Sequence, residues 1–197
     1  MASELDICNA GLSHVSAYGI QSLDERTKEA RECKRLYPIA RDAMLESHDW
    51  AIARKRVALA LLSDTYSGWD YAYAWPADCI MPRKIYDEGE CAGSEKIKFE
   101  FGVSAALNRR VILTNQEDAE LIYTAKVTDA NLYTTMMIDA LSFRLASDLA
   151  LPLRSDSKLQ ASMKNQFIGM ISAAQASVAN AEEKPPETKS DFHKARD

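Results

Sequence analysis

The apolar and polar positions divide the chain into three zones and a polar end. Residues 1–50 and 129–183 place apolar side chains at helical spacing, whereas residues 51–128 alternate apolar and polar side chains as strands do. Residues 184–197 are polar and contain a proline pair. We therefore expect an α+β fold, with a helical bundle formed by N- and C-terminal helices, an inserted antiparallel β-region and an extended, flexible C-terminal tail.

Capping residues predict where the N-terminal helices begin. Ser3 and Asp6 form a capping-box pair, which predicts a first helix from Ser3. The segment Ser22–Glu25 is a second capping box and predicts the start of the next helix. Pro38 falls inside the apolar pattern of that helix, so we expect a kink there, with two shorter helices as the alternative.

The C-terminal zone predicts two helices. The first begins after Asp129 and is expected to end near Pro152, because proline interrupts helical hydrogen bonding. Ser155 or Asp156 is placed to cap the second helix. Its expected buried face consists of Leu159, Met163, Phe167, Met170, Ala174 and Ser177.

Strand signals lie between the two helical zones. Residues 51–61 alternate and predict an extended segment with one face in the core, and residues 71–75 predict a strand that Pro76 ends. Residues 97–101 carry the clearest alternation, and 111–113 and 119–127 are two further candidates. The intervals are too short for parallel crossovers, so the sheet should be antiparallel.

Composition and charge narrow the class of function. Hydrophobic residues are 47% and charged residues 27% of the 197 positions, which is typical of a globular protein. The net charge of -5 argues against a protein that coats nucleic acid with a basic face. Apolar runs are shorter than the ~20 residues of a membrane span, so we expect no membrane partner.

Sequence motifs for catalysis are absent. The chain has three histidines, His14, His48 and His193, and none lies in a zinc-protease pattern. Neither the GxSxG pattern of a serine nucleophile nor a glycine-rich phosphate loop occurs. We therefore predict no catalytic residue and a protein that is not an enzyme.

Metal and cofactor motifs are also absent. The acidic residues Asp87, Glu88 and Glu90 lack the order of a calcium loop, and a solvated loop is the simpler interpretation. No two cysteines have the close spacing of a zinc or redox motif. We interpret all four as small buried hydrophobes and expect neither a metal nor a cofactor; they are Cys8, Cys33, Cys79 and Cys91.

Basic and aromatic clusters leave two interpretations open. Residues 54–56 and Arg109–Arg110 either contact nucleic acid or pair with acidic neighbours on exposed strands. The dense aromatics are either a ligand-stacking platform or part of the core and a subunit interface, and we favour the second interpretation. These aromatic residues are Trp69, Tyr71, Tyr73 and Trp75.

The order of several segments resembles a known family. A W-x-x-A segment begins at Trp50, a Y-x-Y-x-x-P-x-D-C segment at Tyr71 and an L-A-x-x-L-A helix at Leu145. Together they resemble tail tubular protein A, the head-to-tail adaptor family of short-tailed bacteriophages. The resemblance spans about residues 5–180, and further matching segments are Glu29–Leu45, Ile112–Asn115 and Leu121–Tyr123.

The resemblance implies a structural role in the virion. Such adaptors form a ring, typically of about twelve copies, beneath the portal protein. The ring extends the channel through which genomic DNA passes, and it offers a platform to the tail nozzle (a tail tubular protein B-like partner) and the tail fibres. The protein would lie in the virion neck, after assembly in the host cytoplasm. C-terminal segments of the family dock on the portal, and here Phe192 would be the apolar anchor, with Lys194 and Arg196 as charge partners.

Three other functions remain as alternatives. The first is a head-completion connector of a long-tailed phage or gene transfer agent. The second is a small hydrolase that uses Asp87, Glu88 or His48, which would need a cleft that brings these groups together. The third is a DNA-binding regulator that uses the basic strand faces.

Overall fold

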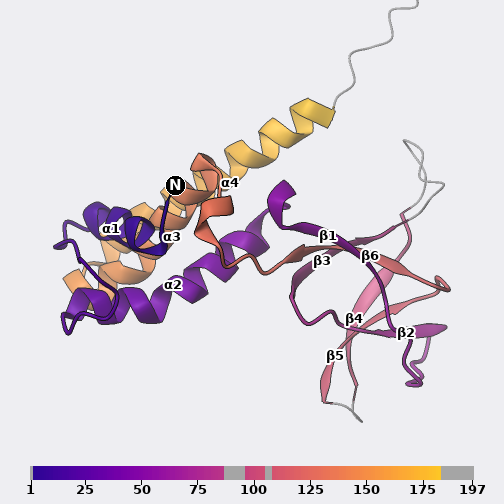
Figure 1. Ribbon diagram of the computed structural model, residues 1–197. Coiled ribbons are helices and arrows are strands. Elements are labelled where there is room, and N and C mark those ends of the chain that lie inside the picture. Colours follow the sequence, from indigo (N-terminus) through magenta and orange to yellow (C-terminus); the bar gives the residue numbers. More distant parts are fainter. Residues whose placement is uncertain (1, 87–95, 105–107, 183–197) are drawn as a thin grey trace, which may run out of the picture.

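Four α-helices make up the helical part of the described residues, and Figure 1 shows their arrangement. They are α1 (Glu4–His14), α2 (Lys28–Ser47), α3 (Thr135–Arg154) and α4 (Ser157–Glu182), in a computed structural model that describes residues 2–86, 96–104 and 108–182. Helix α3 packs against the other three. Their apolar side chains share one buried core, and each large member contributes about 1.5–3 kcal/mol relative to exposure. The largest fully buried side chains of this core are Ile7, Leu12, Tyr37, Met44, Leu45, Met137, Leu141, Leu145 and Leu149.

The first predicted cap is confirmed and the second is wrong. The Ser3 hydroxyl accepts the Asp6 amide at 3.1 Å, and the Asp6 carboxylate accepts the Ser3 amide at 2.8 Å. Residues 22–25 instead form a turn: the Glu25 carboxylate accepts the Ser22 amide as in a capping box, but the Ser22 hydroxyl accepts the amide of Asp24, and the Glu25 amide donates to the Ser22 carbonyl. Helix α2 begins later, where the side chain of its N-cap, Thr27, accepts the Ala30 amide.

Both prolines within helices are tolerated. Helix α2 continues as a single helix across Pro38, so the alternative of two shorter helices is wrong. Helix α3 passes Pro152 and ends at Arg154, after which Ser155 adopts the left-handed conformation with φ 52°. Asp156 then caps α4 by accepting the amides of the second and third residues of that helix at 2.9 Å.

Within the described residues, six strands form two small antiparallel sheets. The first has the order β1-β6-β3, and the second has the order β2-β5-β4. The apolar side chains Tyr73, Ile85, Ile112, Leu121 and Tyr123 form one buried cluster in the β-region. The strands are β1 (Arg54–Ala58), β2 (Tyr71–Ala74), β3 (Cys79–Ile85), β4 (Phe99–Ser104), β5 (Arg109–Thr114) and β6 (Glu120–Ala125).

Two strands differ from the sequence-based expectation. All five residues of β1 are exposed, so the prediction that this segment turns one face into the core is wrong. Strand β3 is not predicted by the sequence pattern, since it contains Pro82 and has two register shifts against β6 that blur its alternation. An edge position explains how β3 accommodates the proline.

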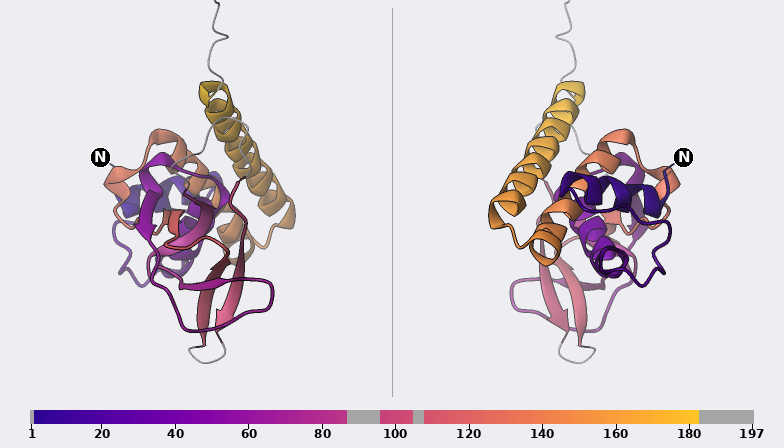
Figure 2. Two further views of the ribbon diagram at one scale, coloured as in Figure 1. Left: turned by 90° about the vertical axis from the view of Figure 1, so that its right-hand side faces the viewer. Right: turned by 90° about the vertical axis from the view of Figure 1, so that its left-hand side faces the viewer.

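The helical part and the sheets lie at opposite ends of the molecule (Figure 1). Helix α2 leads through the 3-10 helix η1 (Ala51–Ala53) into β1, and β6 leads back through η2 (Ala130–Leu132) into α3. Helix α4 is the longest helix described, and its C-terminal turns extend away from the other helices (Figure 2). The molecule is therefore elongated, with a joint where α2 meets the sheets.

Candidate functional site

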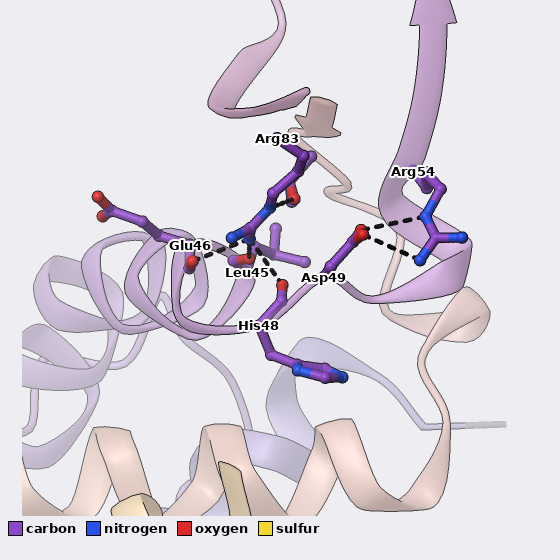
Figure 3. A network of polar contacts seen from close by, with 7 residues as sticks. Leu45, Glu46, His48, Asp49, Arg54 and Arg83 are labelled. Atoms are coloured by element: carbon purple, nitrogen blue, oxygen red, sulfur yellow. Dashed lines mark hydrogen bonds and ion pairs between the residues drawn. The ribbon is translucent and has the colours of Figure 1, made fainter. Parts of the chain in front are cut away.

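Arg83 connects the sheets to the end of α2 (Figure 3). Its Nε donates to Thr124 Oγ1 at 2.7 Å, between two strands of the first sheet. Its Nη2 donates to the backbone carbonyls of Leu45 at 3.3 Å, Glu46 at 2.9 Å and His48 at 2.8 Å. One cationic side chain thus satisfies carbonyl groups that the last turn of a helix leaves without intrahelical partners.

The chain that follows α2 is held by two further contacts. The Asp49 carboxylate accepts both Nε and Nη2 of Arg54, at 3.2 and 2.9 Å (Figure 3). The buried Trp50 donates its indole N–H to the carbonyl oxygen of Met44 at 2.9 Å. Burial lowers the pKa of Arg83, and the nearby Asp49 opposes that shift. Three neighbouring sets of polar contacts therefore hold helix, turn and sheet together at the joint.

A mostly apolar pocket of about 350 Å³ opens beside this joint. The turn after α2, the start of α3 and one residue of α4 supply its walls. Ile52 and Met136 leave more than a third of their surface exposed there. Its lining residues are His48, Asp49, Trp50, Ala51, Ile52, Arg54, Thr134, Met136, Met137 and Ala174.

The polar groups of this pocket are already engaged in protein contacts. Burial lowers the pKa of His48, whose ring meets Trp50 edge-on at 4.7 Å. Asp49 is held by Arg54, so it does not form a carboxylate–imidazole pair with His48. The mostly apolar lining of the pocket is suited to receiving an apolar side chain.

One side of α4 is exposed and built from small residues. Ile168 is 50% exposed, and a methyl group placed at Gly169 would meet no atom within 4 Å. Four further exposed residues of α4 follow at intervals of three or four positions, which places them on the same side of the helix as Ile168 and Gly169. We call this set the α4 stripe: Ala161, Asn165, Ile168, Gly169, Ser172 and Ala176.

The four predicted aromatic residues do not form one platform. Tyr73 is buried in the cluster of the β-region and donates its hydroxyl to the carbonyl of Gln116 at 2.9 Å. Tyr71 and Trp75 pack at the edge of the same cluster. Trp69 belongs to a separate small cluster, and its indole N–H donates to Glu100 at 3.1 Å.

The basic residues of β1 are paired with acidic neighbours. Lys55 contacts Asp78 at 2.6 Å, and Arg56 contacts Glu120 while its guanidinium lies over the Tyr86 ring. On β5, Arg110 lies 5.2 Å from the centre of the Trp75 ring. Pairing removes much of the positive charge that a DNA-binding regulator would need on this strand.

The remaining candidate groups are dispersed in the described part of the chain. His14 stacks on Phe143 at 4.3 Å and contacts Ser142 Oγ at 3.1 Å, and burial lowers its pKa. Cys8 and Cys33 are buried free thiols, and Cys79 is half-buried. Among described residues, no group of three or more His, Cys, Asp or Glu side chains is placed to hold a metal ion.

Several residues singled out from the sequence lie outside the described residues. The three acidic residues Asp87, Glu88 and Glu90 belong to this group, as does Cys91. The same holds for His193 and for the expected portal-docking residues Phe192, Lys194 and Arg196. Within the ranges that the structure covers, no helix is long and apolar enough to cross a bilayer.

Sequence reasoning missed Arg83 and the pocket. The partners of Arg83 are mostly backbone carbonyls, which every residue carries, so no sequence pattern marks them. The pocket joins Trp50, Met136 and Ala174 across more than a hundred positions of sequence, and only the fold brings them together. Comparison with models of known protein families and with curated proteins finds no match to this chain.

Proposed function

We propose that this protein is a structural head-to-tail adaptor of a short-tailed phage virion. Copies of the chain would form a ring beneath the portal, extend the DNA channel and carry the tail nozzle and fibres. In this proposal the helical part is the bundle of the tail tubular protein A-like family, and the β-region is its insertion. The proposal is supported by the three sequence segments that begin at Trp50, Tyr71 and Leu145, which follow one another in the order found in that family.

The observation that carries the proposal is the presence of two different exposed surfaces, a stripe of small residues around Ile168 and a mostly apolar pocket. A closed ring with more than two subunits needs a heterologous interface, in which unlike patches of neighbouring copies meet. The α4 stripe is one such patch, and the pocket beside the joint is another. We propose that Ile168 of one copy packs at the pocket mouth of the next, between Ile52 and Met136.

The small residues of the α4 stripe support this packing. Gly169, Ser172 and Ala176 have little side-chain volume, so the backbone of a neighbouring element can approach α4 closely. The open space above Gly169 leaves that approach unobstructed. The extension of α4 beyond the other helices places part of the stripe where a second copy can reach it (Figure 2).

The joint supports a role in a channel wall. An adaptor can hold the tail in a defined position relative to the portal only when its own parts keep a fixed relative orientation. The contacts of Arg83 with the end of α2 and with Thr124 provide that fixed connection. On the sheets, acidic partners offset the charge of Arg54, Lys55 and Arg56, which suits a surface along which DNA slides without being held.

The C-terminal segment completes the proposal. We propose that residues 181–197 dock on the portal, with Phe192 as apolar anchor and Lys194 and Arg196 as charge partners. A segment that becomes ordered only on the portal gives up conformational entropy at that step, which limits premature assembly.

The location of the protein in the virion tests this function. An antibody raised against the purified chain and coupled to gold is applied to purified virions and viewed by electron microscopy. The proposal predicts gold particles at the head–tail junction of tailed particles. Virions that lack the protein, or carry it on the capsid surface or fibre tips, would contradict it.

A further inference from the structure

Among the described residues, strand β4 is the sheet edge with the fewest of the usual protections. Open strand edges invite pairing with another chain, and proteins usually protect them with charges, prolines, bulges or a covering segment. Within the described ranges β4 pairs only with β5, so it forms one edge of its sheet. Its register against β5 shows no shift over six residues, and it contains no proline.

The three other edges each carry one of these protections. Strand β1 consists largely of charged residues, which are paired with acidic partners. Strand β3 contains Pro82 and two register shifts. The outer edge of β2 is covered by residues 60–62, since the Leu62 amide donates to Ala72 and the Ala74 amide donates to Ala60, both at 2.8 Å.

Strand β4 also presents apolar side chains to solvent. Phe101 is 47% and Val103 is 62% exposed, and they lie two positions apart on one face of the sheet. Phe101 meets Trp75 edge-on at 5.6 Å, and Arg110 lies over the same Trp75 ring. The edge therefore has hydrogen-bonding backbone and an adjoining apolar face together, as strand-adding recognition sites do.

The charges around β4 indicate what kind of strand fits. Lys96 precedes the strand. At the other end of β4, Arg109 and Arg110 of β5 lie opposite Ser104 and Val103 in the strand register. All three basic side chains are exposed. Glu100 points to the opposite face, where it accepts the Trp69 indole N–H. Antiparallel pairing of two β4 strands would bring basic ends toward each other, which disfavours a second copy of this chain.

We propose that the β4 edge binds an extended segment of another protein, which adds to the sheet as a further strand. The segment carries apolar side chains at alternate positions, which pack beside Phe101 and Val103. It carries acidic residues at both ends, which face Lys96 on one side and Arg109 and Arg110 on the other. This inference does not depend on the adaptor function, because it rests on the edge itself.

A synthetic peptide tests the inference. The probe is fluorescein-labelled Asp-Glu-Ile-Thr-Val-Thr-Val-Glu-Asp, titrated with the full-length chain and followed by fluorescence anisotropy. We expect saturable binding, and slower amide hydrogen exchange in β4 but not in β1. A peptide with lysine in place of each acidic residue should bind about tenfold more weakly, and one with N-methylated central amides should not bind.

Matched variants locate the binding edge. V103S removes the most exposed apolar side chain of β4, and we expect it to weaken binding about tenfold. V57S is the control, because Val57 is also an exposed valine on an edge strand, and it should leave binding within about twofold. Far-ultraviolet circular dichroism checks that both variants fold.

Four results would overturn the inference. These are absence of saturable binding up to about 1 mM peptide, equal effects of V103S and V57S, and equal binding of the lysine-flanked peptide. The fourth is a concentration-dependent dimer that V103S abolishes, since it would assign the edge to a second copy of this chain.

Discussion

Arg83 Nη2 donates a hydrogen bond to the backbone carbonyl of His48 at 2.8 Å, and so links a strand of the first sheet to the residue that ends α2 (Figure 3). The same guanidinium also reaches the carbonyls of Leu45 and Glu46. A half-buried cation surrounded by carbonyl oxygens stabilises the joint in two ways: it completes the helix end, and it fixes the direction in which the sheets leave the helical part.

Replacement of Arg83 should weaken the whole fold. R83M keeps the apolar stem but leaves the carbonyls at the end of α2 without their donor, which should cost about 3 kcal/mol of unfolding free energy. For a domain of this size that corresponds to a fall in Tm of about 6–12 °C, measured by scanning calorimetry. R31M is the matched control, because Arg31 is exposed on α2, the helix whose end Arg83 contacts, and it should change Tm by less than about 2 °C. A fall no larger than that of R31M would show that the joint does not depend on Arg83.

The buried His48 and the half-buried His14 should make stability depend on pH. Burial lowers the pKa of His14 and His48, while Asp139 and Asp49 oppose the shift. The folded state therefore binds fewer protons than the unfolded state just below pH 6.5. Their contribution to stability is complete above about pH 6.5 and is lost as the pH falls through 6.5 toward the folded pKa values.

Urea unfolding at about pH 7.5 and about pH 5.5 measures this dependence. The wild type should lose free energy of unfolding between the two values, and the double variant H14Q/H48Q should lose less. The comparison uses the difference between pH values within each protein, so the loss of the stacking of His14 on Phe143 cancels. An equal loss in both proteins would contradict the assignment to these two side chains.

Two glycines in helices should respond to alanine in opposite directions. A methyl group at Gly11 would lie 3.2 Å from Leu145 Cδ2, where α1 and α3 approach closely, and the crowding should cost about 1–2 kcal/mol. A methyl group at Gly169 meets no atom, so G169A should raise stability by about 0.5–1 kcal/mol through the helix preference of alanine. Chemical denaturation measures both changes, and a destabilising G169A would mean that the surface around Gly169 is not open in the monomer.

A charge on the α4 stripe should prevent ring assembly without unfolding the chain. Ile168 is half exposed, so I168E should change Tm by less than about 2 °C. In a ring the same glutamate would be buried against an apolar pocket, which is strongly unfavourable. Gradient sedimentation with portal rings should show wild-type chain migrating with the portal and I168E remaining free. K158E, on the first turn of α4, is the control and should migrate with the portal.

Local chemistry explains which elements could be predicted from the sequence. The cap at Ser3 depends on residues three positions apart, and the strand at Phe99–Phe101 depends on simple alternation. The prediction of a cap at Ser22 is wrong because only half of the capping box forms: Glu25 accepts the Ser22 amide, but the Ser22 hydroxyl accepts the amide of Asp24, two residues on. Competition between two local hydrogen-bond patterns is decided by the path of the chain, which the sequence pattern does not contain.

The candidate site could be predicted only in part. Trp50 and His48 stand out in the sequence as single residues, but the pocket needs Met136 and Ala174 from distant helices. Both faces of β1 are exposed, although its sequence alternates like that of a strand with one buried face. Arg83 binds carbonyl groups, whose positions follow from the tertiary fold alone.

The mass that the portal gains from this chain tests the central proposal most directly. Purified portal rings from the same phage are mixed with the protein at micromolar concentration, and the particle mass is measured by mass photometry. Twelve copies of a 22.0 kDa chain would add about 264 kDa, and the adaptor proposal predicts a single shifted species near that gain. An unchanged mass, with correctly assembled portal and folded chain, would contradict the proposal.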